Sequence, residues 1–242
     1  MAEARTSWPK HILVGVDLRD CSLAALRLAA LMAEKASATL SVVHILPLSA
    51  EHSPLSEAIF FPEASEEMTR VENDLVLFIR RAIGRRPMPE YRILRAHASD
   101  GILFAGRYER AGLIVLGTRG MGNKSDLTLG SIAEQVLNRS AIPVMTLCSR
   151  RFTRRRPDTI RRILCPVNLS TAAARALEVA VQIGKDFGAE VTALEIVERK
   201  ADDSAVKKEE GRLRAWLKSQ LTRVTRVTVS EDTALTAVYE PD

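Results

Sequence analysis

The stretch HILVGVDLRDCSLAALRLAALMAEKASATLSVVHIL, residues 11–46, decides the fold. A short β-branched run is followed by a polar turn, an alanine- and leucine-rich segment of about four helical turns, and a second apolar run. A helix that links two neighbouring strands in this order crosses over the sheet, so the strands must be parallel. The stretch therefore predicts a β-α-β unit of an α/β fold.

The same pattern returns later in the chain. RILCPVNLSTAAARALEVAVQIGKDFGAEVTALEIVE begins at Arg162 and aligns with the stretch from His11 without a gap, at an offset of 151 residues. A repeat of this length indicates two copies of one unit.

The first copy continues beyond residue 46 with alternating helical and strand patterns. Its further elements are expected at 65–83 (helix, closed by Gly84), 91–96 (strand), 100–111 (helix), 113–117 (strand), 130–140 (helix) and 144–148 (strand). The predicted fold is an open five-stranded parallel sheet of order 3-2-1-4-5 with helices on both faces, Rossmann-like, plus a second incomplete copy.

The second copy runs out early. Strands are expected at 163–167, 190–197 and 224–229 and a helix at 206–221, and a third helix could begin within SEDTALTAVYEPD, residues 230–242. We divide the chain into a complete domain at 1–149, an arginine-rich linker at 150–161 and an incomplete domain at 162–242. The sequence leaves open whether the second domain is naturally short or truncated.

A glycine-rich stretch, GTRGMGNKSDLTLGS at residues 117–131, follows the apolar run 113–116. A strand end, a glycine turn and a helix start together present backbone N–H groups that favour phosphate. The stretch is not a P-loop, because Asn123 separates Gly122 from Lys124. It therefore predicts a nucleotide site of another type.

Asp17 is expected across the cleft from this stretch. In the predicted sheet the winding reverses between strands one and four, and ligands bind at the carboxyl ends of strands at such a point. The Asp17 carboxylate could accept a hydrogen bond from an adenine amino group or a ribose hydroxyl. The alternative is that Asp17 only caps the helix or closes a turn.

These residues resemble those of the ATP-binding universal stress proteins, which are often tandem repeats. The resemblance implies that ATP, possibly with Mg²⁺, binds once per chain, and that the chain forms a homodimer through the edge strand Pro143–Cys148. It implies the following site residues: Gly15, Asp17, Ile45, Leu116, Gly117, Arg119, Gly120, Gly130, Ser131 and Ile132.

Departures from the family pattern concern both copies. Gly15 stands where proline is common, which should loosen the adenine pocket slightly. In the second copy Pro166 is present, but Asn168 replaces the aspartate and no glycine loop follows. That copy is predicted to lack a nucleotide site.

The expected function is a nucleotide-responsive binding or regulatory module in stress response. Two alternatives stay open, a slow Mg-dependent ATPase and a nucleotide-free structural or interaction protein. Catalysis has little support, because none of the four histidines has the spacing of a Ser/His/Asp or metal site.

Composition narrows the partners and the compartment. The net charge is +5, but seven arginines lie in residues 150–162, which we interpret as a solvated tether, so nucleic-acid binding is unlikely. No apolar run reaches the ~20 residues of a membrane span. The three cysteines form no disulfide or metal pattern, which favours the cytoplasm.

Overall fold

The computed structural model describes residues 9–48, 65–118, 130–147, 160–196, 203–220, 226–230 and 234–239. The chain forms two compact units, one within Pro9–Asp158 and one within Thr159–Asp242. Each unit is described by itself.

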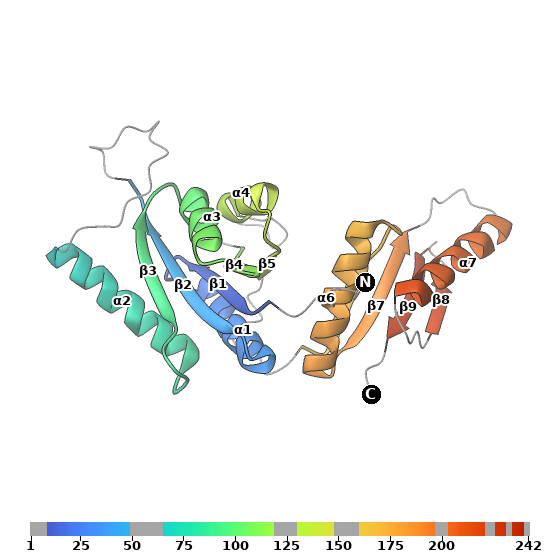
Figure 1. Ribbon diagram of the computed structural model, residues 1–242, viewed down its shortest axis with the longest axis horizontal. Helices are drawn as coiled ribbons and strands as arrows, with labels where there is room; N and C mark the ends of the chain where they lie inside the picture. The colour runs from blue at the N-terminus through green and yellow to red at the C-terminus, as the bar shows by residue number, and fades with distance from the viewer. Residues whose placement is uncertain are drawn as a thin grey trace, which may run out of the picture. The chain divides into compact units, whose positions relative to one another are not determined.

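The first unit alternates strands and helices (Figure 1). Its elements are β1 (His11–Val16), α1 (Asp20–Ala36), β2 (Thr39–Leu46), α2 (Glu66–Ile83), β3 (Glu90–Arg95), α3 (Ala98–Tyr108), β4 (Leu113–Gly117), α4 (Ser131–Arg139) and β5 (Val144–Leu147). The strand order is β3-β2-β1-β4-β5 and every pairing is parallel. Helices α1 and α2 lie on one face of the sheet, and α3 and α4 on the other (Figure 1). The predicted doubly wound fold is confirmed.

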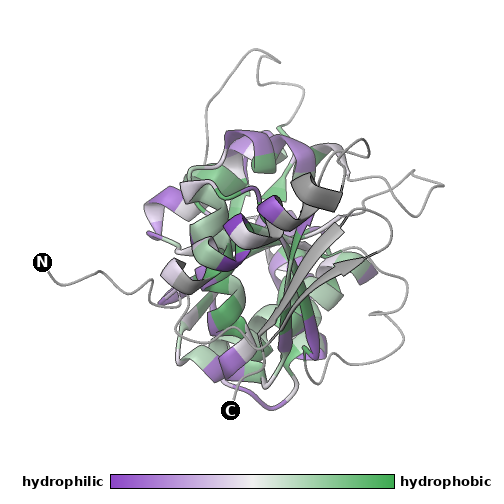
Figure 2. Cartoon of the chain, turned by 90° about the vertical axis from the view of Figure 1, so that its right-hand side faces the viewer, coloured by the Kyte–Doolittle hydropathy of each residue, from purple (hydrophilic) through white to green (hydrophobic). Residues whose placement is uncertain are grey.

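The central strand β1 is buried on both faces of the sheet. Ile12, Leu13 and Val14 of β1 are all fully buried, because helices cover both faces of the sheet. The helices carry both hydrophilic and hydrophobic residues, as expected for elements that cover a sheet with one face only (Figure 2).

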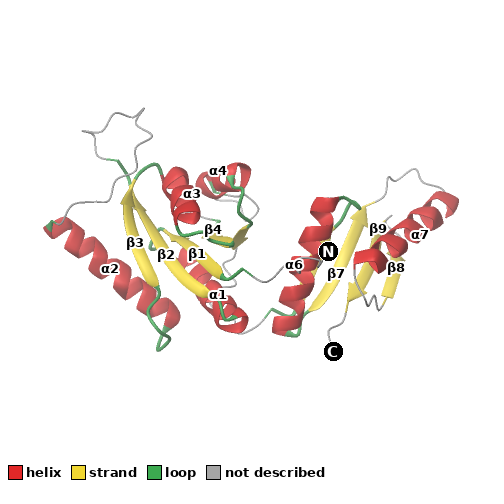
Figure 3. Ribbon diagram, in the orientation of Figure 1, coloured by secondary structure: helices red, strands yellow, loops and turns green. Residues whose placement is uncertain are grey.

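The second unit begins with the same β-α-β pattern and then departs from it. Its elements are β6 (Arg162–Pro166), α6 (Thr171–Phe187), β7 (Glu190–Ile196), α7 (Asp203–Gln220), β8 (Arg226–Ser230) and β9 (Ala234–Tyr239). Strands β6 and β7 are parallel, whereas β9 is antiparallel to both β7 and β8, which gives the order β6-β7-β9-β8 (Figure 3).

The expected third helix within residues 230–242 is wrong. Residues 234–239, ALTAVY, form β9 instead and pair along their whole length with β7. Only three residues separate β8 from β9, a spacing that suits a hairpin, and the β-branched and aromatic residues Thr236, Val238 and Tyr239 suit a strand. The hairpin places β9 beside β7, whereas in the first unit the third strand, β3, takes the corresponding place beside β2.

Candidate functional site

A cavity of about 510 Å³ opens at the carboxyl ends of β1 and β4, where the winding of the sheet reverses. Eight of the ten predicted site residues line it: Gly15, Asp17, Ile45, Leu116, Gly117, Gly130, Ser131 and Ile132. Arg119 and Gly120 lie outside the described residues. Sequence reasoning missed the other lining residues: Val16, Ser22, Val43, His44, Ala98, Ile102, Thr118 and Ala133. Of these, Thr118 had a usable signal, since it is a hydroxyl residue directly after the predicted strand 113–117.

Asp17 closes a turn and also faces the cavity. Its Oδ1 accepts hydrogen bonds from the Ser22 hydroxyl at 2.6 Å and from the Arg19 N–H at 3.1 Å. Its Oδ2 lies 4.0 Å from Arg19 Nε, and the side chain is 45% exposed. The turn role and the ligand role are therefore compatible, because each uses a different carboxylate oxygen.

Gly117, which lines the cavity, lets two backbone segments approach closely. A Cβ on Gly117 would lie 2.8 Å from the backbone carbon of Cys21 and 2.8 Å from the nitrogen of Ser22. The end of β4 therefore rests directly on the first turn of α1.

At Gly15 a Cβ would lie 2.7 Å from Leu116 Cδ2 and 3.2 Å from Ile102 Cδ1. The loosening expected from glycine in place of proline is not seen here, because these neighbouring side chains occupy the space.

The first turn of α4 forms the opposite wall. Gly130 is its N-cap, has ordinary extended backbone angles and carries no side chain to cap the helix. Free N–H groups at a helix start carry a partial positive charge. The Gly130 N–H itself donates to the Thr118 carbonyl at 2.7 Å. The Thr118 N–H and hydroxyl both donate to the Leu147 carbonyl, at 2.8 and 2.9 Å.

His44 connects the ends of β1 and β2. Its Nδ1 lies 2.8 Å from the Val16 carbonyl oxygen, and because a carbonyl can only accept, Nδ1 donates. This contact gives His44 a structural role at the ends of the two strands.

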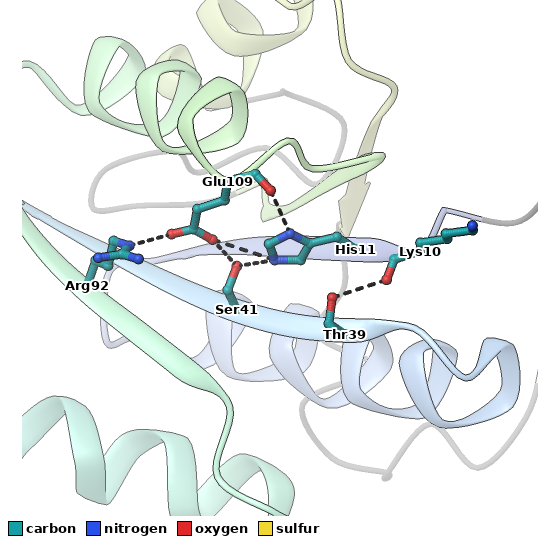
Figure 4. A network of polar contacts seen from close by, with 6 residues as sticks. All are labelled: Lys10, His11, Thr39, Ser41, Arg92 and Glu109. Atoms are coloured by element: carbon teal, nitrogen blue, oxygen red, sulfur yellow. Dashed lines mark hydrogen bonds and ion pairs between the residues drawn. The ribbon is translucent and has the colours of Figure 1, made fainter.

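A second polar cluster lies at the other end of the sheet (Figure 4). His11 Nδ1 donates to the Glu109 backbone carbonyl at 2.9 Å, and His11 Nε2 lies 2.8 Å from the Ser41 hydroxyl. That hydroxyl also contacts Glu109 Oε2, and Arg92 Nε donates to Glu109 Oε1 at 2.9 Å. The fold thus brings together a serine, a histidine and a carboxylate whose sequence spacing gave no such indication.

This cluster is not arranged as a nucleophilic triad. In a triad the carboxylate orients the histidine through Nδ1, but here a backbone carbonyl takes that place and the carboxylate contacts the serine. Ser41 is also only 2% exposed. The cluster therefore joins β1, β2, β3 and the end of α3 as a structural element.

Within the described ranges, no group of His, Cys, Asp and Glu side chains could hold a metal ion. Among the helices of the same ranges, none combines the length and apolar character needed to cross a bilayer.

The second unit has the same turn after its first strand, but an asparagine stands where the first unit has Asp17. Leu18 and Leu169, which correspond in the repeat, both have a φ of 59°. Asn168 stands in the place of Asp17, and its Oδ1 accepts from the Ser170 hydroxyl at 2.6 Å. This shared turn shows that the repeat extends to backbone detail.

The fold and the cavity define a doubly wound α/β protein with a cleft at the topological switch point. The pattern of the universal stress protein family matches residues 9–147 and 159–240, so the chain belongs to this family. A universal stress protein from Thermus aquaticus, described as lying in the QAH/OAS sulfhydrylase 3′ region, is 31% identical over 136 residues. That alignment covers 56% of this chain and 96% of the relative.

Solved structures support the fold across both units. A universal stress protein from Archaeoglobus fulgidus DSM 4304 has a TM-score of 0.57 at 22% identity, covering 87% of this chain and 75% of that one. A universal stress protein from Pseudomonas aeruginosa UCBPP-PA14 has a TM-score of 0.55 at 18% identity, covering 87% and 68%.

Proposed function

We propose that the first unit binds ATP and works as a nucleotide-responsive regulatory module in stress response. The observation that carries the proposal is the meeting of Asp17, Gly117 and the α4 start in one cavity of about 510 Å³. Ligand pockets for small molecules commonly have volumes of about 300–1,000 Å³. Family membership supports the same proposal.

We propose a different region of the lining for each part of ATP. The apolar wall of Val43, Ile45 and Ile102 suits the adenine ring. Asp17 lies at the exposed rim, where Oδ2 can accept a hydrogen bond from a ribose hydroxyl.

The start of α4, with Gly130 and Ser131, suits the phosphates because its free N–H groups and the helix dipole favour anions. Mg²⁺, where it accompanies ATP, is bound largely by phosphate oxygens. Nucleotide occupancy would then alter the partner or dimer contacts of the first unit.

Asp17→Ala tests the site directly. We expect ATP affinity measured by calorimetry to fall about tenfold or more, because a hydrogen bond to a charged group contributes about 1.5–3 kcal/mol. The matched control is Asn168→Ala, which removes the corresponding side chain of the second unit and should leave the affinity unchanged.

Mass spectrometry of nucleotide released from the purified protein gives an independent check. Absence of ATP binding at millimolar concentration contradicts the proposal and favours a nucleotide-free interaction protein. Mg-dependent phosphate release that disappears in Asp17→Ala would instead indicate a slow ATPase.

We also propose that the chain forms a homodimer through β5, the edge strand of the described sheet; Cys148, which ends the predicted strand, lies outside the described residues. Exposed edges invite pairing with a second strand. The Pro143 and Leu147 carbonyls accept from β4, so by alternation the Thr146 N–H points to the free edge.

Thr146→Pro is therefore expected to convert the dimer to a monomer in light scattering while the circular dichroism spectrum stays unchanged. Thr146→Val keeps the N–H and should remain dimeric. A wild-type protein that is monomeric at high micromolar concentration would contradict the dimer.

We propose a cytoplasmic location from the pattern of the cysteines. The three cysteines of the chain have no disulfide or metal-ligand pattern in the sequence, as expected in a reducing compartment. Recovery of the protein in an oxidising compartment by cell fractionation would contradict this location.

A further inference from the structure

We propose that Ser22 is a positioning residue for the nucleotide site, which holds the Asp17 carboxylate so that Oδ2 is presented to the ligand. This inference rests on the proposed function, because it specifies how the acid of that site is oriented. Ser22 lies on the first turn of α1 and lines the cavity, but its contacts are with the turn around Asp17.

The Ser22 hydroxyl is the centre of this turn. It donates to Asp17 Oδ1 at 2.6 Å, with the Arg19 carbonyl at 3.0 Å as a second acceptor within reach. It accepts from the N–H groups of Asp17 and Arg19, at 3.3 and 3.2 Å. Ser22 is only 3% exposed, so water cannot readily replace its hydroxyl.

The contacts on Asp17 make the carboxylate asymmetric. Oδ1 accepts from two donors, the Ser22 hydroxyl and the Arg19 N–H, which fill its usual capacity. Among the residues that the structure describes, the polar group recorded near Oδ2 is the Arg19 side chain, at 4.0 Å. Asp17 therefore contacts a ligand hydroxyl through a single oxygen, whose position depends on the bond to Ser22.

In the second unit a serine hydroxyl also bonds the side-chain oxygen that follows the first strand, but this serine occupies a different position of the repeat. Ser170, the N-cap of α6, donates to Asn168 Oδ1 at 2.6 Å, and Ala173 stands where the first unit has Ser22. In each unit one serine hydroxyl holds the first side-chain oxygen after the strand. In the first unit the serine is Ser22, within the first turn of α1, and Arg19 occupies the N-cap position that Ser170 has in the second unit.

The experiment compares two ligands on one variant. In Ser22→Ala we expect ATP affinity to fall about fivefold, and affinity for 2′,3′-dideoxy-ATP to fall less than about twofold, because only the first ligand has ribose hydroxyls for Asp17. A purely structural effect would lower both affinities by the same factor, so the ratio separates the two roles. Ser170→Ala is the control and should change neither affinity.

A rescue variant uses the arrangement of the second unit. Arg19→Ser with Ser22→Ala supplies the hydroxyl from position 19, as Ser170 does for Asn168. We expect this double variant to bind ATP within about twofold of Arg19→Ser alone. The double variant also covers the case in which Ser22→Ala unfolds, since it restores a hydroxyl to the turn.

Three results are decisive. A Ser22→Ala protein with equal losses for both ligands, or a double variant without rescue, overturns the positioning role while ATP binding by the wild type stands. A wild type that binds no ATP overturns the proposed function and this inference together.

Discussion

Replacing Gly117 with alanine is expected to lower the free energy of unfolding of the first unit by about 2–3 kcal/mol. The new Cβ would lie 2.8 Å from two backbone atoms of Cys21 and Ser22, and a backbone cannot move aside as a side-chain end can. The end of β4 must therefore separate from α1. Because Gly117 and Ser22 both line the cavity, ATP affinity should fall as well.

Gly15→Ala is the matched control for this prediction. It lies at the end of the neighbouring strand β1, and its Cβ would meet side-chain ends of Leu116 and Ile102 rather than backbone. We expect a loss of about 1 kcal/mol, because those side chains can shift. Urea unfolding measures the loss in the free energy of unfolding for both variants. Hydrogen exchange of α1 and β4 peptides then shows whether these two elements are the ones destabilised. Equal losses for the two alanines would contradict the role assigned to the backbone contact.

Removing the Glu109 side chain is expected to be at least as destabilising. Its carboxylate is 6% exposed and contacts Arg92, Ser41 and His11. Glu109→Ala leaves the Arg92 guanidinium and the Ser41 hydroxyl without this acceptor, while the backbone carbonyl that accepts from His11 remains. Because the Arg92 side chain is 35% exposed, we expect a loss at the lower end of the about 3–5 kcal/mol that breaking a buried pair costs. Glu109→Gln keeps one acceptor oxygen and should lose less.

The control for Glu109 is a surface pair of the same chemistry. Glu67 lies 3.5 Å from Arg95 and its side chain is 74% exposed, so Glu67→Ala should change the unfolding free energy by less than about 1 kcal/mol. If the melting temperatures of Glu109→Ala and Glu67→Ala fall by the same amount, the cluster at the amino end of the sheet is not a structural element.

The sequence predicted the strands of the first unit, their order and half of the residues that line the cavity, because each depends on local pattern and on topology. Apolar runs mark the strands, and the parallel order then brings Asp17 and Gly117 to one edge. The β9 strand was missed because its stability comes from pairing with β7 and β8, which no local periodicity shows.

The polar cluster was missed for a related reason. His11 contacts Ser41 and Glu109, which are 30 and 98 residues away in the chain. Contacts at such separations depend on where strands and helices end in space. The same holds for the filled space at Gly15, which depends on the side chains of β4 and α3.

Thr118 links the end of β5 to the start of α4 in the first unit. Its amide and hydroxyl both hold the Leu147 carbonyl at the end of β5, and its own carbonyl holds the Gly130 N–H at the start of α4. Because Thr118 is buried, its hydrogen bonds have few alternative geometries. A displacement of Leu147 is therefore expected to move Gly130 as well. A strand that adds to β5 would therefore shift the start of α4 without touching a ligand.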